Sequence, residues 1–121
     1  MKTLEATLKV KPLSANKMYY RGKRSKTKEY LDYQHEIRDE LIGVGWPFED
    51  KPVSLKLNVG LSNRAADLDN VLKPLLDTLQ SIFEEFNDNK VYHIDATKLK
   101  VEKGEEHIVI KIERYINENE L

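Results

Sequence analysis

Asp67, Asp69 and Asn70 have the clearest potential for chemistry, because they place two carboxylates and an amide between a strand-like and a helix-like segment. In an extended loop, residues i and i+2 point to the same side, so the two aspartates can share one cation. Mg²⁺ prefers oxygen ligands and commonly takes only one or two carboxylates besides water and substrate phosphate. The spacing therefore predicts a divalent-metal site, in which Asn70 orients a ligand or caps the helix.

Lys73 follows Asp69 by about one helical turn, so its ammonium could lie beside a phosphate held at the same ion. A purely structural explanation competes with this one. Aspartate is a favourable N-cap, and its charge suits the start of a helix, so Asp67 and Asp69 could serve only to begin the helix. Lys73 would then be an ordinary exposed lysine.

A third carboxylate, Asp88, lies in the run Asn87-Asp88-Asn89-Lys90, ahead of a β-rich segment. Asparagine and aspartate tolerate the backbone angles that turns require. Taken alone, the run is typical of a turn and indicates no activity.

The cations are concentrated in the first quarter of the chain, although the whole chain carries 20 Lys+Arg against 21 Asp+Glu. The stretch from residue 11 to 28 contains no acidic residue and predicts a surface that binds phosphates. A solvated loop with no partner is the alternative. The basic residues of this stretch are Lys11, Lys17, Arg21, Lys23, Arg24, Lys26 and Lys28.

The elements that must position these side chains follow from hydrophobic periodicity. Alternation of apolar residues predicts strands at 3–10 and 53–59, separated by a long basic loop and by a helix that begins after Thr27. A second helix is expected to start at Asp69 or Asn70, which puts Pro74 in or near its first turn.

Residues 91–102 favour a strand whose apolar parity changes, which predicts a bulge or bend near Thr97. Gly104 is expected to turn the chain into a last strand, so that the chain ends in an antiparallel hairpin. The predicted fold class is α+β: a single domain, residues 1–116, with a mixed β-sheet and two main helices in the order β-α-β-α-β-β. Residues 117–121 are expected to form a frayed C-terminal tail.

Composition excludes several classes of function. The sequence has no cysteine, which rules out disulfides, thiol chemistry and cysteine-ligated zinc. No stretch approaches the roughly 20 apolar residues of a membrane span. We therefore expect a cytoplasmic protein without a membrane partner.

The run from Asp67 to Val91 resembles the signature region of RusA-type crossover-junction endodeoxyribonucleases, and Pro12-Leu13-Ser14-Ala15-Asn16 resembles their N-terminal motif. The resemblance implies that Asp67, Asp69 and Asp88 are catalytic aspartates that bind metal, and that Lys73 is a catalytic lysine. It also implies supporting roles for Ser14, Asn16, Asn70 and Lys98. Two positions depart from the family pattern: only Arg64 remains of a basic run before the first aspartate, and Lys90 replaces a common glutamine.

The resemblance further implies a RusA-like fold and an enzyme that depends on Mg²⁺ or Mn²⁺ and resolves Holliday junctions by paired symmetric nicks. Two cuts by chains with one acidic cluster each imply a homodimer, whose partner is four-way junction DNA. DNA contacts are expected from Lys17, Arg21, Lys23, Arg24, Lys26, Lys28 and Arg64. Alternatives are a nuclease for other branched or flap DNA, a structural domain, or a non-catalytic binder of branched DNA, in which the three aspartates need not meet.

Overall fold

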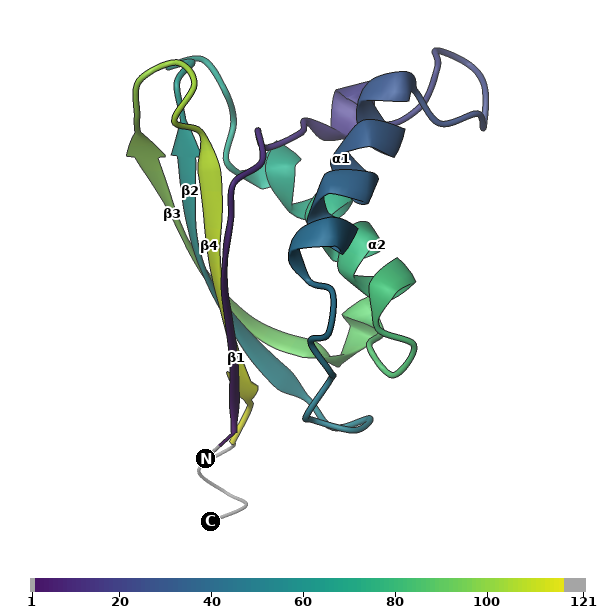
Figure 1. The fold of residues 1–121 in the computed structure, drawn as a ribbon, viewed down its shortest axis with the longest axis vertical. Helices are drawn as coiled ribbons and strands as arrows, with labels where there is room; N and C mark the ends of the chain where they lie inside the picture. The colour runs from purple at the N-terminus through teal and green to yellow at the C-terminus, as the bar shows by residue number, and fades with distance from the viewer. Residues whose placement is uncertain (1, 117–121) are drawn as a thin grey trace.

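Six main elements follow one another in the order strand, helix, strand, helix, strand, strand, as the sequence predicts. The computed structural model describes residues 2–116, and the predicted tail at 117–121 lies outside them. The helices pack on one face of a single four-stranded sheet (Figure 1), which makes the domain α+β. The elements are β1 (Thr3–Leu8), α1 (Lys28–Glu40), β2 (Val53–Leu61), α2 (Leu72–Ile82), β3 (Val91–Lys100) and β4 (His107–Arg114), with short 3₁₀ turns η1 (Ala15–Lys17), η2 (Asp69–Val71) and η3 (Asp88–Lys90).

The sheet has the order β1-β4-β2-β3 and is mixed: β2 and β3 are parallel, and the other pairs are antiparallel. The predicted terminal hairpin is therefore wrong, because β2 lies between β3 and β4. The apolar content of the strands accounts for this order. Ile110 and Ile112 of β4 pair with Leu57 and Leu55 of β2, and all four are buried, whereas β3 is mostly exposed and occupies an edge.

The predicted bulge near Thr97 is also misplaced. Pairing between β2 and β3 is regular from His93 to Lys100, and the register shift lies at the other end of the strand. There Val91 pairs with Val53 and His93 with Ser54, so Tyr92 is the extra residue. β3 needs no strict apolar alternation, because its residues are exposed or half-buried on both faces.

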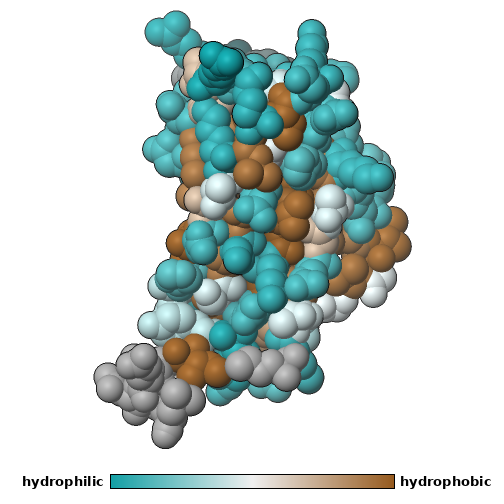
Figure 2. All heavy atoms as spheres, turned by 90° about the vertical axis from the view of Figure 1, so that its left-hand side faces the viewer, coloured by the Kyte–Doolittle hydropathy of each residue, from teal (hydrophilic) through white to brown (hydrophobic). Residues whose placement is uncertain are grey.

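The helices close the core over one face of the sheet. Tyr30, Tyr33 and Ile37 of α1 and Leu75 and Leu79 of α2 are buried against the apolar rows of the strands. The opposite face of the sheet has no helix over it and carries many hydrophilic side chains (Figure 2). The hydrophobic core therefore lies between the sheet and the two helices.

Local signals fix both helix starts. Thr27 caps α1, since its hydroxyl accepts a hydrogen bond from the Tyr30 amide at 3.1 Å. The turn η2 precedes α2, which begins at Leu72, slightly later than predicted, and Pro74 lies in its first turn. No helix in residues 2–116 is long and apolar enough to cross a membrane.

Candidate active site

A cleft of about 520 Å³ opens where β2 ends and α2 approaches. The N-terminal Pro-Leu-Ser-Ala-Asn segment, the first turns of α1 and the loop after β2 form its walls. Its polar lining includes Lys11, Ser14, Asn16, Lys17, Glu29, Asp32, Glu36, Asn63, Asp67, Asn70 and Glu106. Asn16 and Asn70, which the sequence singled out, thus line the same cleft as the first predicted metal ligand.

Asp67 occupies an exposed position in the loop that joins β2 to η2. The side-chain Nδ2 of Asn70 donates a hydrogen bond to Oδ2 of Asp67 at 3.4 Å, so Asn70 orients this carboxylate. Lys98 holds the preceding residues, because its Nζ donates to the carbonyls of Arg64 and Ala66 at 2.9 and 2.6 Å. Lys98 therefore positions the loop.

Asp69 begins η2 and is exposed. In the part of the chain that the structure describes, neither aspartate is the N-cap of a helix, although Asp69 is the acidic residue in the first turn of η2. The N-caps of η2 and α2 are Leu68 and Val71, and neither makes a side-chain capping hydrogen bond. The carboxylates of Asp67 and Asp69 thus make no capping hydrogen bond at the start of η2 or α2.

Lys73 lies in the first turn of α2 with its side chain 65% exposed. Its Nζ is 3.3 Å from Oδ2 of Asp77, one turn further along the helix. The lysine thus pairs with a carboxylate near the middle of α2, and its predicted place beside a bound phosphate stays a prediction.

Asp88 lies beyond the far end of α2, in η3. Its amide donates to Oε1 of Gln80 at 3.0 Å, and Asn87 caps the turn by accepting from the amide of Asn89. A helix of 11 residues, about 16 Å long, separates Asp88 from Asp69. Figure 1 shows α2 running obliquely beside the sheet, with its N-terminal end nearer the upper end of the sheet and its C-terminal end lower.

The pairing register of β2 and β3 also separates Asp88 from Asp67. η3 leads into β3 beside Val53 at the start of β2, whereas Asp67 follows the end of β2. Within residues 2–116, no three histidine or acidic side chains form a group that could hold a metal ion. The structure thus places Asp67 and Asp69 at one end of the domain and does not bring Asp88 to them within one chain.

The predicted DNA-binding cations divide into two sets. Three are tied to α1: Lys17 lies 3.9 Å from Glu29, Lys28 lies 2.8 Å from Asp32, and Lys26 donates to Gln34 at 3.0 Å. Within the described part of the chain, no ion pair involves the other predicted cations of the basic loop or the arginine in the short loop after β2. These unpaired cations are Arg21, Lys23, Arg24 and Arg64.

Ser14 has a local role, since its hydroxyl accepts from the Asn16 amide at 3.3 Å and caps η1. It also lines the cleft.

Sequence reasoning missed an acidic row along the cleft. Glu29, Asp32 and Glu36 share one face of α1, and their spacing of three and four residues was the signal that could have found them. Glu106 faces them from the turn before β4. Hydrogen bonds from its own amide, from the Ser62 hydroxyl and from the Gly104 amide lower the pKa of its carboxyl.

An exposed carboxylate at a cleft and a nearby basic loop are features that suit a domain that binds or cuts nucleic acid.

Comparison with known proteins makes this class specific. Residues 9–113 match the family model for endodeoxyribonuclease RusA, and the chain belongs to this family of endodeoxyribonucleases. The chain is also 30% identical over 120 residues to the crossover junction endodeoxyribonuclease RusA of Aquifex aeolicus (strain VF5), with 93% of this chain and 92% of the relative covered.

Proposed function

We propose that this endodeoxyribonuclease resolves four-way DNA junctions by paired symmetric nicks, acts as a homodimer and depends on a divalent cation, with Mg²⁺ as the expected ion. The name of the Aquifex relative supports the substrate. The observation that carries the proposal is the pair of exposed carboxylates of Asp67 and Asp69, which make no capping hydrogen bond. They lie at the end of the domain that bears the basic loop. DNA held by that loop would pass over the pair.

The two carboxylates fit a hard divalent cation, because they offer oxygen ligands and stay exposed to water and substrate. Asn70 holds Asp67 in place, and Lys98 fixes the loop before it. When bound, the ion would polarise the phosphate and lower the pKa of a water molecule. Lys73 is exposed and would stabilise charge on the leaving oxygen after exchanging Asp77 for the phosphate.

In a homodimer, Asp88 could bind the same cation as Asp67 and Asp69, which it does not reach within one chain. A two-fold axis near the middle of α2 exchanges its two ends, so Asp88 of the partner subunit would approach Asp67 and Asp69. Two such composite sites form in each dimer, which suits two symmetric cuts. The flank that would meet the partner is the open edge β3, where Tyr92, Ile94 and Leu99 are exposed.

The test is cleavage of a labelled synthetic four-way junction and a matched linear duplex, with Mg²⁺ or with EDTA. Wild-type protein is expected to make paired nicks in the junction alone, and Asp69→Asn to make none. Asp50→Asn, at an exposed turn outside the site, is the matched control. Cleavage that persists in EDTA or in Asp69→Asn would contradict the proposal.

A second candidate is a non-catalytic binder of branched DNA, which the separation of Asp88 from the other two aspartates favours. Tight junction binding without cleavage under Mg²⁺ or Mn²⁺ would establish it. Equal cleavage of flap and four-way substrates would instead identify a nuclease for branched DNA in general. A cytoplasmic location remains a prediction, and the cysteine-free sequence suits it.

A further inference from the structure

The basic loop is an ordered turn in its central part. The amide of Thr27 donates to the Met18 carbonyl and that of Tyr20 to the Ser25 carbonyl, both at 3.0 Å. The amide of Lys23 donates a hydrogen bond to the Tyr20 carbonyl at 2.9 Å. Gly22 adopts the positive φ of 70° that this tight reversal of the chain requires. Met18 to Thr27 thus form a closed turn, which we call the basic turn and which projects from the domain in Figure 1.

Two consecutive tyrosines begin the basic turn and have different surroundings. Tyr19 packs edge-on against Tyr30 of α1, with ring centres 6.0 Å apart at 78°, and its backbone bridges Lys26. Consecutive residues of an extended segment point to opposite sides, so Tyr20 faces away from α1. Its side chain is 52% exposed, and it forms no aromatic pair within residues 2–116.

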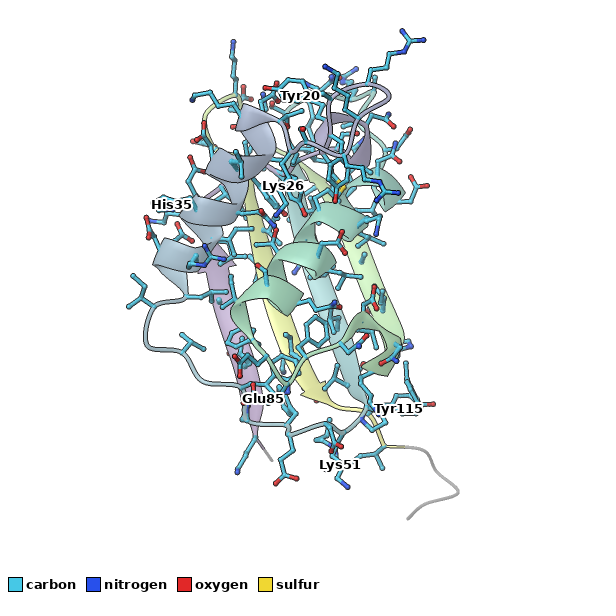
Figure 3. The ribbon with its side chains drawn as sticks, turned by 90° about the vertical axis from the view of Figure 1, so that its right-hand side faces the viewer. Tyr20, Lys26, His35, Lys51, Glu85 and Tyr115 are labelled. Atoms are coloured by element: carbon cyan, nitrogen blue, oxygen red, sulfur yellow. The ribbon has the colours of Figure 1, made fainter. Side chains whose placement is uncertain are left out.

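Figure 3 shows Tyr20 at the end of the molecule opposite Lys51 and Tyr115. This is also the end of the cleft, because Lys17, the residue before the basic turn, lines the cleft together with Asp67. Lys26 secures the base of the turn, with its Nζ 5.3 Å from the centre of the Tyr30 ring. A ring in water is thus held on a fixed turn beside the candidate active site.

The chemistry around the ring indicates its ligand. Arg21, Lys23 and Arg24 follow Tyr20 directly and are exposed and unpaired among the described residues. An aromatic face bordered by cations is the way proteins hold unpaired nucleotides, by stacking on the base and binding the flanking phosphates. Bases within a continuous duplex cover one another's faces, so such a platform requires a site where stacking is interrupted.

We propose that Tyr20 stacks on a base that is unstacked at the branch point of the DNA, while Arg21, Lys23 and Arg24 hold the phosphates on either side. This inference rests on the proposed function, because it requires branched DNA as the ligand. It adds a residue that recognises the branch itself.

The experiment measures binding by fluorescence anisotropy in EDTA, with a four-way junction and a linear duplex of the same sequence. Stacking contributes enough per base that Tyr20→Ala is expected to weaken junction binding by about tenfold or more and to leave duplex binding unchanged. Tyr20→Phe keeps the ring and should bind as wild type does. Leu31→Ala is the control, because Leu31 on α1 is also 52% exposed and should not affect binding.

A second readout is the fluorescence of 2-aminopurine at the branch point, which stacking on a ring quenches. Wild type and Tyr20→Phe are expected to quench it, and Tyr20→Ala is not. Equal junction binding by wild type and Tyr20→Ala, or equal losses on junction and duplex, would overturn the inference while leaving the proposed function in place. If wild type does not prefer the junction to the duplex, the proposed function and this inference fail together.

Discussion

The aspartates that the sequence resemblance assigns to catalysis lie at the two ends of α2, and the two ends differ in what surrounds them. At the N-terminal end, Asp67 lines the cleft together with Lys17, the residue before the basic turn, and Lys98 holds the loop that presents Asp67. At the C-terminal end, Asp88 lies in a capped 3₁₀ turn and its amide binds Gln80. Among the described residues, the first end borders the cleft, whereas Asp88 lies in a turn whose cation is Lys90.

This difference shows that the distance along α2 decides how the motif can work. A helix of 11 residues keeps its ends about 16 Å apart, and its buried face, with Leu75 and Leu79, fixes it to the sheet. One chain therefore cannot bring its carboxylates together by a small movement. Either Asp88 is dispensable, or a second chain provides it, and mutation can separate these explanations.

The largest expected effect is loss of cleavage in Asp88→Asn. If a partner's Asp88 completes each site, this variant should be as inactive as Asp69→Asn, at least about a hundredfold below wild type, because a metal ligand is lost in both. Asp50→Asn should cleave normally. Junction cleavage under single-turnover conditions measures the rates, and thermal unfolding confirms that the variants fold. Normal cleavage by Asp88→Asn would mean that the C-terminal end is only a turn.

Mixing the two inactive variants makes the comparison sharper. In a heterodimer of Asp69→Asn and Asp88→Asn, one composite site contains both substitutions and the other contains none. Random exchange of subunits should restore about a quarter of the wild-type sites, and each active dimer should make one nick instead of a pair. The mixture is assayed after the subunits have exchanged, beside each variant alone. If all three aspartates acted within one chain, mixing would restore no activity.

The basic loop predicts the next effect, on binding. Replacing Arg21, Lys23 and Arg24 by alanine should weaken DNA binding and make the dependence of log K on log salt shallower by roughly 2 to 3, because about three phosphate contacts are lost. Replacing Lys17, Lys26 and Lys28, which α1 already engages, should change the slope less. Anisotropy titrations at several salt concentrations measure it. Equal slopes for the two triple variants would mean that the division of the cations has no functional meaning.

The sequence predicted the features that depend on neighbours along the chain. These include the order of the elements, the cap at Thr27 and the place of Pro74 in the first turn of α2. The capping role considered for Asp67 and Asp69 is absent, because backbone turns begin α2 without side-chain help. Local pattern was therefore a good guide to elements and a weaker guide to the roles of single side chains.

Features that depend on partners far along the chain were not predicted. β4 pairs with β2 instead of β3 because its isoleucine row needs the centre of the sheet, and this competition does not show in either strand alone. The separation of Asp88 from Asp69 follows from the parallel pairing of β2 and β3, which puts η3 beside the start of β2. The resemblance identified the three aspartates but contained no information on whether one chain unites them.

The smallest effect concerns Tyr30, which joins α1 to the middle of α2, between its two ends. Burial, then the nearby charges of Asp77 and Tyr19, raise its pKa to about 12. Well below pH 10 the ring is protonated in both the folded and the unfolded chain, so it adds no pH dependence there. Between pH 10 and 12 the unfolded chain loses this proton first, and the free energy of unfolding falls as the pH rises.

By pH 11 the loss due to Tyr30 should be about 1 kcal/mol. Burial also raises the pKa of Tyr33, which adds to the decline in the same direction. Tyr30→Phe should therefore lose about 1 kcal/mol less than wild type between pH 9 and pH 11, as measured by urea unfolding at both values. An identical decline in the variant would show that the pKa of Tyr30 is not raised by its place between α1 and α2.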